Sequence, residues 1–160
     1  MAIGIGDRIP SLTLVKATSE GPQPLESNEY FAGRKVALFS VPGAFTPTCS
    51  ARHLPSFVEK ADELRAKGID EIACTAVNDA FVMAAWGKAS EVDGKITMLA
   101  DGSGEFAKAL GLDADFSKFG MGMRGQRWSA LVDDGVVKQL NVEEPGGYGV
   151  SGAEHLLGQL

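Results

Sequence analysis

The sequence has few cysteines, no long apolar run and no cluster of basic residues, and each shortage excludes a class of protein. Only Cys49 and Cys74 occur among 160 residues, which is too few for the disulfide framework of a small secreted domain. No apolar stretch approaches the roughly 18–20 residues that span a bilayer, so no membrane partner is expected. The 15 basic residues are scattered and the net charge is −6, which makes nucleic acid a poor partner.

The ends and the middle of the chain carry no sign of targeting or of division into parts. The first residues, MAIGIGDRIPS, lack a charged region followed by an apolar one and so do not resemble a signal peptide. A reducing, cytoplasmic location is the default expectation, and a trimmed organellar form stays open. Because no repeat, low-complexity tract or linker interrupts residues 1–160, they are expected to form one domain.

Short apolar runs alternate with helical periodicities along the chain. The runs expected to be strands are residues 36–41, 72–77, 96–100, 128–132 and 136–142, and the helices expected between and around them are residues 27–31, 54–64, 81–86 and a short one after Asp101. Strands that alternate with helices favour a parallel central set, and the Asp-Asp-Gly turn before residue 136 favours an antiparallel hairpin at its edge. The sequence therefore predicts an α/β class, a thioredoxin-like fold with a central mixed sheet flanked by helices.

Three weaker patterns complete this prediction. Residues 9–16 have the alternation of a half-buried strand, which the Gly-Pro-Gln-Pro segment at 21–24 is expected to break. The glycine-rich stretch 111–125 predicts irregular structure. Ser151 followed by Glu154 predicts a capping box at the start of a final helix.

Cys49 stands directly after the expected strand at 36–41, in the first turn of the next helix. Unpaired N–H groups and the helix dipole favour negative charge there, and hence the thiolate. Full ionisation of a thiol accelerates its attack by only about thirtyfold, or about 2 kcal/mol, so other groups must hold the substrate. Thr46 offers a hydroxyl, Pro42 and Pro47 stiffen the turn, and a guanidinium would complete the site.

The two cysteines also allow other interpretations. Cys49 in an inert binding module would be a small buried hydrophobe. A thiol-disulfide oxidoreductase needs a CxxC pair, but Arg52 occupies the second position. Cys49 and His53 are one helical turn apart, but neither Cys74 nor His155 adds a third ligand at metal-site spacing. The sequence therefore predicts no metal and no cofactor.

The string PGAFTPTC at residues 42–49 resembles the active-site motif of the peroxiredoxins, and nearly the whole chain is similar to their type II branch, in its plant and bacterial form within the redoxin family. Carried over by position, the resemblance implies that Cys49 is the peroxidatic nucleophile and that Thr46 hydrogen-bonds the peroxide. It also implies that Pro42 shields the thiolate and that Arg127 activates both sulfur and peroxide. Arg124 lies close by, but Arg127 directly adjoins the expected strand as the family arginine does.

The resemblance implies an antioxidant peroxidase that reduces hydrogen peroxide and alkyl hydroperoxides through a Cys49 sulfenic acid. The C-terminal stretch GGYGVSGAEHLLGQL contains no cysteine, unlike that of the animal-type members of this branch. The resemblance to the plant and bacterial members implies glutathione with glutaredoxin, or thioredoxin, as the reductant. Cys74, in an apolar strand pattern, is either a packed core thiol or a resolving cysteine. A homodimer is also implied, with Phe45, Phe81 and Trp86 either in the core or near a dimer contact beside the active site.

Overall fold

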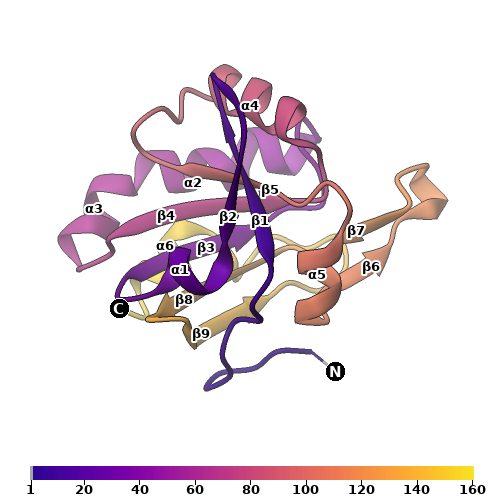
Figure 1. Ribbon diagram of the computed structural model, residues 1–160. Coiled ribbons are helices and arrows are strands. Elements are labelled where there is room, and N and C mark those ends of the chain that lie inside the picture. The colour runs from indigo at the N-terminus through magenta and orange to yellow at the C-terminus, as the bar shows by residue number, and fades with distance from the viewer. Residues whose placement is uncertain (1) are drawn as a thin grey trace.

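The structure is a computed structural model and describes residues 2–160, in which a mixed β-sheet is covered on both faces by helices (Figure 1). The strands of the large sheet are β1 (Thr13–Thr18), β2 (Gly21–Glu26), β3 (Lys35–Ser40), β4 (Glu71–Ala76), β5 (Thr97–Ala100), β8 (Trp128–Asp133) and β9 (Val136–Val142). They are ordered β2-β1-β5-β4-β3-β8-β9. The three central strands β3, β4 and β5 run parallel, while β1, β2, β8 and β9 pair antiparallel with their neighbours.

Helices cover the two faces of the sheet unequally. The helices are α1 (Ser27–Phe31), the π-helix η1 (Cys49–His53), α2 (Leu54–Glu59), α3 (Ala61–Ala66), α4 (Ala80–Ala89), α5 (Glu105–Leu110), the 3₁₀-helix η2 (Ser117–Phe119) and α6 (Ala153–Leu157). Residues of η1, α2, α3, α4 and α6 join one core cluster, and residues of α1 and α5 join the other. The predicted α/β class with a central mixed sheet is thus confirmed.

Strand β3 shows why the central strands have continuous apolar sequences. Ala37 and Phe39 point into the cluster beneath η1 and α2, whereas Val36 and Leu38 point into the cluster beneath α1 and α5. A strand between two parallel or antiparallel neighbours and under two helical layers has no face left for polar side chains. The continuous apolar sequence of β3 therefore predicts the strand. The turn that follows β3 lies at one end of the sheet.

Residues 21–24, which were expected to break the strand before them, form a strand of their own: β1 ends at Thr18 and these residues lie within β2. Pro22 and Pro24 pair with Ala17 and Val15 of β1 at the outer edge of the sheet. An edge strand needs hydrogen bonds on one side only, so a proline whose nitrogen faces outward interrupts no ladder. The two prolines also protect this edge from pairing with another chain.

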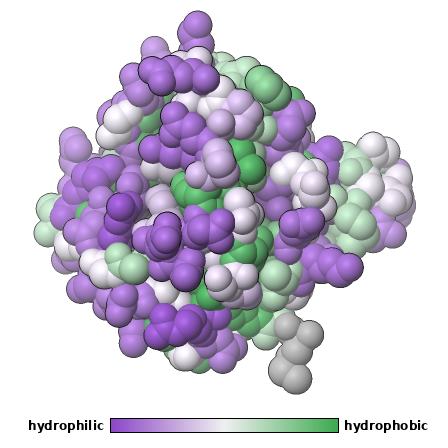
Figure 2. Space-filling model, viewed as in Figure 1, coloured by the Kyte–Doolittle hydropathy of each residue, from purple (hydrophilic) through white to green (hydrophobic). Residues whose placement is uncertain are grey.

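The glycine-rich stretch 111–125 is more regular than expected. It contains β6 (Asp113–Asp115) and β7 (Met123–Gly125), which pair antiparallel and project from the body of the molecule (Figure 1). Hydrophobic side chains are exposed on this projection, including Phe119 and Met123. The face shown in Figure 2 is mostly hydrophilic, with hydrophobic residues in scattered patches.

Two helix starts differ in how their first N–H groups are satisfied. Asp79 caps α4, since its carboxylate accepts a hydrogen bond from the N–H of Val82 at 2.8 Å. The capping box at Ser151 and Glu154 is wrong: Gly152 precedes α6, and the Ser151 hydroxyl donates instead to Glu143 at 2.7 Å. None of the helices within residues 2–160 is long and apolar enough to cross a membrane.

Candidate active site

Cys49 begins the π-helix η1, just beyond the carboxyl end of the central strand β3. The wide turn is made by a hydrogen bond from the N–H of Leu54 back to the carbonyl of Cys49. Single π-helical turns of this kind occur often at functional sites, because they redirect side chains within a helix. The Cys49 side chain is fully buried.

The turn before Cys49 is held by a small set of hydrogen bonds. The Thr46 hydroxyl donates to the carbonyl of Gly43 at 2.7 Å, and the N–H of Ala44 donates to the side-chain oxygen of Asn78 at 2.9 Å. Between them Phe45 has a φ of 62°, a left-handed conformation that costs a non-glycine residue about 1–3 kcal/mol. The surrounding bonds therefore maintain a turn that the local sequence alone would not favour.

The two arginines near the turn have different partners. Arg127 Nη2 donates to the Cys49 sulfur at 3.1 Å, and its Nη1 donates to Nδ1 of His53 at 2.9 Å. Arg124 Nη1 instead donates to the carbonyl of Pro42 at 3.2 Å. The structure thus brings Arg127 to the sulfur, while Arg124 braces the backbone at Pro42.

His53 is fully buried and lies against Arg127. Burial lowers the pKa of His53 from 6.5 to about 3, with a smaller contribution from the positive charge of Arg127. The ring is therefore neutral. Because arginine only donates, Nδ1 must accept, and the proton sits on Nε2, which donates to the carbonyl of Ser151 at 2.9 Å. Within residues 2–160 no three His, Cys, Asp or Glu side chains gather as metal ligands.

Comparisons with known proteins find relatives that match nearly the whole chain. The family model described as Redoxin matches residues 5–157. Peroxiredoxin-2B of Arabidopsis thaliana is 46% identical and covers 99% of this chain and 98% of its own. Peroxiredoxin-2E, chloroplastic, of the same plant is 47% identical over 99% of this chain and 70% of its own. The reduced Prx3 of Vibrio vulnificus in complex with hydrogen peroxide is 52% identical, covers 98% of both chains and superposes with a TM-score of 0.94.

The chain belongs to the type II peroxiredoxins of the redoxin family. A peroxiredoxin is an oxidoreductase that reduces peroxides with thiols, and the sequence-based recognition of the family is confirmed. The thioredoxin-like fold predicted from the alternating elements is that of its structural neighbours.

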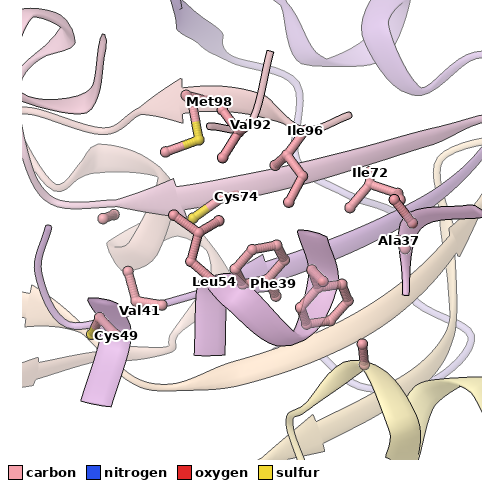
Figure 3. Packing of buried hydrophobic residues seen from close by; sticks show 14 of the residues in the cluster. Ala37, Phe39, Val41, Cys49, Leu54, Ile72, Cys74, Val92, Ile96 and Met98 are labelled. Carbon is pink, nitrogen blue, oxygen red and sulfur yellow. The ribbon is translucent and has the colours of Figure 1, made fainter. Parts of the chain in front are cut away.

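The second cysteine of this peroxiredoxin lies inside the sheet. Cys74 is fully buried on β4, paired with Phe39 of β3 and Met98 of β5. In Figure 3 its side chain points into the hydrophobic cluster toward Leu54, whereas Cys49 lies at the edge of the cluster. Burial raises the pKa of the Cys74 thiol well above its usual value, with a smaller contribution from the nearby Cys49. These surroundings favour the packed thiol over a thiolate that reacts readily.

Trp86 is buried, which supports its core interpretation, and its indole N–H donates to the Ser50 hydroxyl at 3.0 Å. Two other residues near the site of the peroxiredoxin were not found by sequence reasoning. Glu143 and Tyr148 lie next to the loop that holds Ser151, and the Tyr148 ring is 5.2 Å from the His53 ring. The one-turn spacing of Cys49 and His53 was a sequence signal that placed His53 near the cysteine. Nothing in the sequence linked the loop that holds Ser151 to these two residues.

Proposed function

We propose that this peroxiredoxin reduces hydrogen peroxide and small alkyl hydroperoxides through a sulfenic acid on Cys49. Thr46, Pro42 and Arg127 complete the site in this proposal, and residues 1–160 act as one domain. The observation that carries it is the 3.1 Å contact from Arg127 Nη2 to the Cys49 sulfur, made by a guanidinium whose other nitrogen is held by His53.

Arg127 serves both the nucleophile and the leaving group. Its positive charge stabilises the Cys49 thiolate, and its fork of N–H groups can donate to a peroxide oxygen beside the sulfur. As the thiolate attacks, a sulfur–oxygen bond forms and the oxygen–oxygen bond breaks. Sulfur gives up two electrons, and the departing oxygen takes a proton to leave as water or an alcohol.

Thr46 is suited to orient the peroxide. Its hydroxyl proton is already directed to the carbonyl of Gly43 at 2.7 Å, so its oxygen is free to accept a hydrogen bond from the O–H of the substrate. Pro42, beside this turn, offers no N–H that would compete for the thiolate. A peroxide held by Thr46 and Arg127 presents its reacting oxygen to the Cys49 sulfur in line with the bond that breaks.

We propose glutathione with glutaredoxin, or thioredoxin, as the reductant that recycles Cys49, and Cys74 as a core thiol. A thiol condenses with the sulfenic acid to a mixed disulfide, and a second thiol releases Cys49. The full burial of Cys74 within β4 supports an external thiol for this step. A reducing compartment, the cytoplasm by default, supplies such thiols.

We also propose a homodimer formed over the surface next to the active-site turn. Phe45 is 55% exposed and Phe81 71% exposed, and large exposed aromatic side chains are typical of interfaces. A groove of about 350 Å³ is lined in part by Phe45 and Trp86. A second copy that covers these side chains would also shield the turn from water.

The central test measures oxidation and recycling separately. One equivalent of hydrogen peroxide should give one dimedone-trapped sulfenic acid per chain in wild type and Cys74→Ser, and none in Cys49→Ser. Peroxide consumption is then coupled either to glutathione and glutaredoxin or to thioredoxin. Absence of the adduct in wild type would overturn the Cys49 assignment, and loss of turnover in Cys74→Ser with intact trapping would make Cys74 the resolving cysteine.

A matched pair of variants tests the arginine. Arg127→Lys keeps the charge but loses the two-pronged contact with sulfur and His53, so the second-order rate of Cys49 oxidation should fall by about a hundredfold. Arg124→Lys removes a guanidinium from the backbone of the same region and should have a much smaller effect. Equal rates for the two variants would contradict the role of Arg127.

A further inference from the structure

The carboxylate of Glu143, directly after β9, accepts several hydrogen bonds from one loop. It accepts hydrogen bonds from the backbone N–H groups of Gly149, Val150 and Ser151, each at 2.8 Å to Oε2, and from the Ser151 hydroxyl at 2.7 Å. Burial alone would raise the pKa of Glu143, but the hydrogen bonds from Ser151, Val150 and Gly149 outweigh it and lower the pKa. The carboxylate is thus ionised at neutral pH and holds this loop in one conformation.

The loop that Glu143 holds leads to the reacting sulfur by a short series of contacts. The carbonyl of Ser151 accepts from His53 Nε2 at 2.9 Å, and His53 Nδ1 accepts from Arg127 Nη1 at 2.9 Å. Arg127 Nη2 then donates to Cys49 at 3.1 Å. In addition, the N–H of Glu143 donates to the carbonyl of Arg127 at 3.0 Å, so both the backbone and the guanidinium of Arg127 are linked to Glu143.

Tyr148 closes the same loop over the outer side of η1. Its hydroxyl donates to the carbonyl of Arg52 at 3.4 Å, and its ring lies 4.5 Å from the Arg52 guanidinium. At Gly152 a Cβ would stand 2.8 Å from the Tyr148 hydroxyl oxygen, so a larger residue there would displace the Tyr148 ring. The loop is therefore packed against the helix that carries Cys49 and His53.

We propose that Glu143 is a positioning residue for the peroxidase reaction: by holding the loop at 149–151 it directs the Ser151 carbonyl at His53, and thereby aims the Arg127 guanidinium at the Cys49 sulfur. The inference rests on the proposed roles of Cys49 and Arg127. A guanidinium is a rigid planar fork, so the direction of one N–H group sets that of the other. An imidazole whose Nε2 proton is held by a carbonyl presents a lone pair at Nδ1.

One substitution of equal size tests the hydrogen bonds that Glu143 accepts from residues 149–151. Glutamine has the size of glutamate but one acceptor oxygen, and its amide N–H₂ would face the donors of the loop. Glu143→Gln should therefore loosen residues 149–151 without opening a cavity. Glu144→Gln is the matched control, because Glu144 is the exposed neighbouring carboxylate.

The first measurement is the second-order rate of Cys49 oxidation by hydrogen peroxide, followed by stopped-flow tryptophan fluorescence at 25 °C. Misplacement of a catalytic group by about 1 Å costs up to about a hundredfold, so Glu143→Gln should be slower than wild type by about tenfold or more. Glu144→Gln should react as wild type does. Thermal unfolding confirms that both variants are folded at the assay temperature.

The second measurement reads the histidine directly, which a merely structural role of Glu143 would not change. With only two histidines in the chain, nitrogen-15 NMR resolves His53 after assignment with His155→Gln. Wild type and Glu144→Gln should show His53 protonated at Nε2 only, and Glu143→Gln should show a mixture with the Nδ1-protonated form. A folded Glu143→Gln with wild-type rate and wild-type tautomer would overturn the inference. A wild-type protein whose Cys49 is not oxidised would instead refute the proposed function itself.

Discussion

Acidification should destabilise this protein through His53, whose imidazole is buried and neutral in the folded state. Burial, and next the charge of Arg127, lowers the pKa of His53 from 6.5 to about 3. In the unfolded chain the ring returns to its ordinary pKa of about 6.5. Between these values the unfolded state binds a proton that the folded state does not, so the free energy of unfolding decreases as the pH falls.

The size of the effect follows from the width of this window. Each pH unit below 6.5 removes about 1.4 kcal/mol until the pH approaches 3, and from pH 7 to pH 5 the loss is about 2 kcal/mol. That is a large part of the roughly 5–15 kcal/mol by which small domains are stable. Other groups also titrate in acid, including Asp101, whose pKa burial raises against the hydrogen bonds from Phe106 and Ala107. Comparison with a His53 variant cancels their contributions.

Urea unfolding at pH 7, 6 and 5, followed by tryptophan fluorescence, measures the loss. Glutamine at position 53 can donate to the Ser151 carbonyl and accept from Arg127 but does not ionise. Wild type should lose about 2 kcal/mol more than His53→Gln between pH 7 and 5. His155→Gln, a change at an exposed histidine, should keep the wild-type loss. Equal pH dependence in wild type and His53→Gln would refute the buried neutral imidazole.

Three further substitutions have defined outcomes. Thr46→Val removes the hydroxyl that orients the peroxide and should slow Cys49 oxidation by about a hundredfold, whereas Thr48→Val should have little effect; stopped-flow kinetics compares them. Gly43→Ala places a Cβ 2.8 Å from Arg124 Nη1 and should lower the midpoint of urea unfolding; an unchanged midpoint would show that this close approach does not destabilise the fold. Phe81→Glu puts a charge on a side chain that is 71% exposed and should shift a dimer to monomer in analytical ultracentrifugation; an unchanged mass would remove Phe81 from the proposed interface.

The sequence predicted those parts of the fold in which burial alone determines both the hydrophobic pattern and the structure. Strands β3 and β4 are buried on both faces, so their sequences are continuous apolar runs and their positions were correct. Strand β2 was missed because an edge strand accepts prolines, which sequence rules count as breakers. Strands β6 and β7 have three residues each, too few for any period to appear.

The candidate site divides in a similar way. Cys49, Thr46 and Pro42 lie in one continuous motif, and Arg127 adjoins a strand that the pattern revealed. The contacts of His53 were not predictable, because helical spacing gives the face of a residue but not the partner that arrives from a distant segment. Ser151 misled for the same reason: its spacing from Glu154 fits a capping box, but a carboxylate from outside the helix took its hydroxyl.

The neutrality of His53 connects the stability of the protein with the geometry at the sulfur. Arg127 donates to Nδ1 of this ring at 2.9 Å, and that bond requires an unprotonated nitrogen. Protonation would replace the lone pair by a second positive charge beside the guanidinium, which would turn Arg127 away from Cys49. The same burial that makes the fold sensitive to acid therefore keeps the guanidinium aimed at neutral pH. Because His53 stays neutral in the folded state down to a pH of about 3, acid removes this arrangement by unfolding the protein, and Cys49 oxidation should be lost together with the folded state as the pH is lowered.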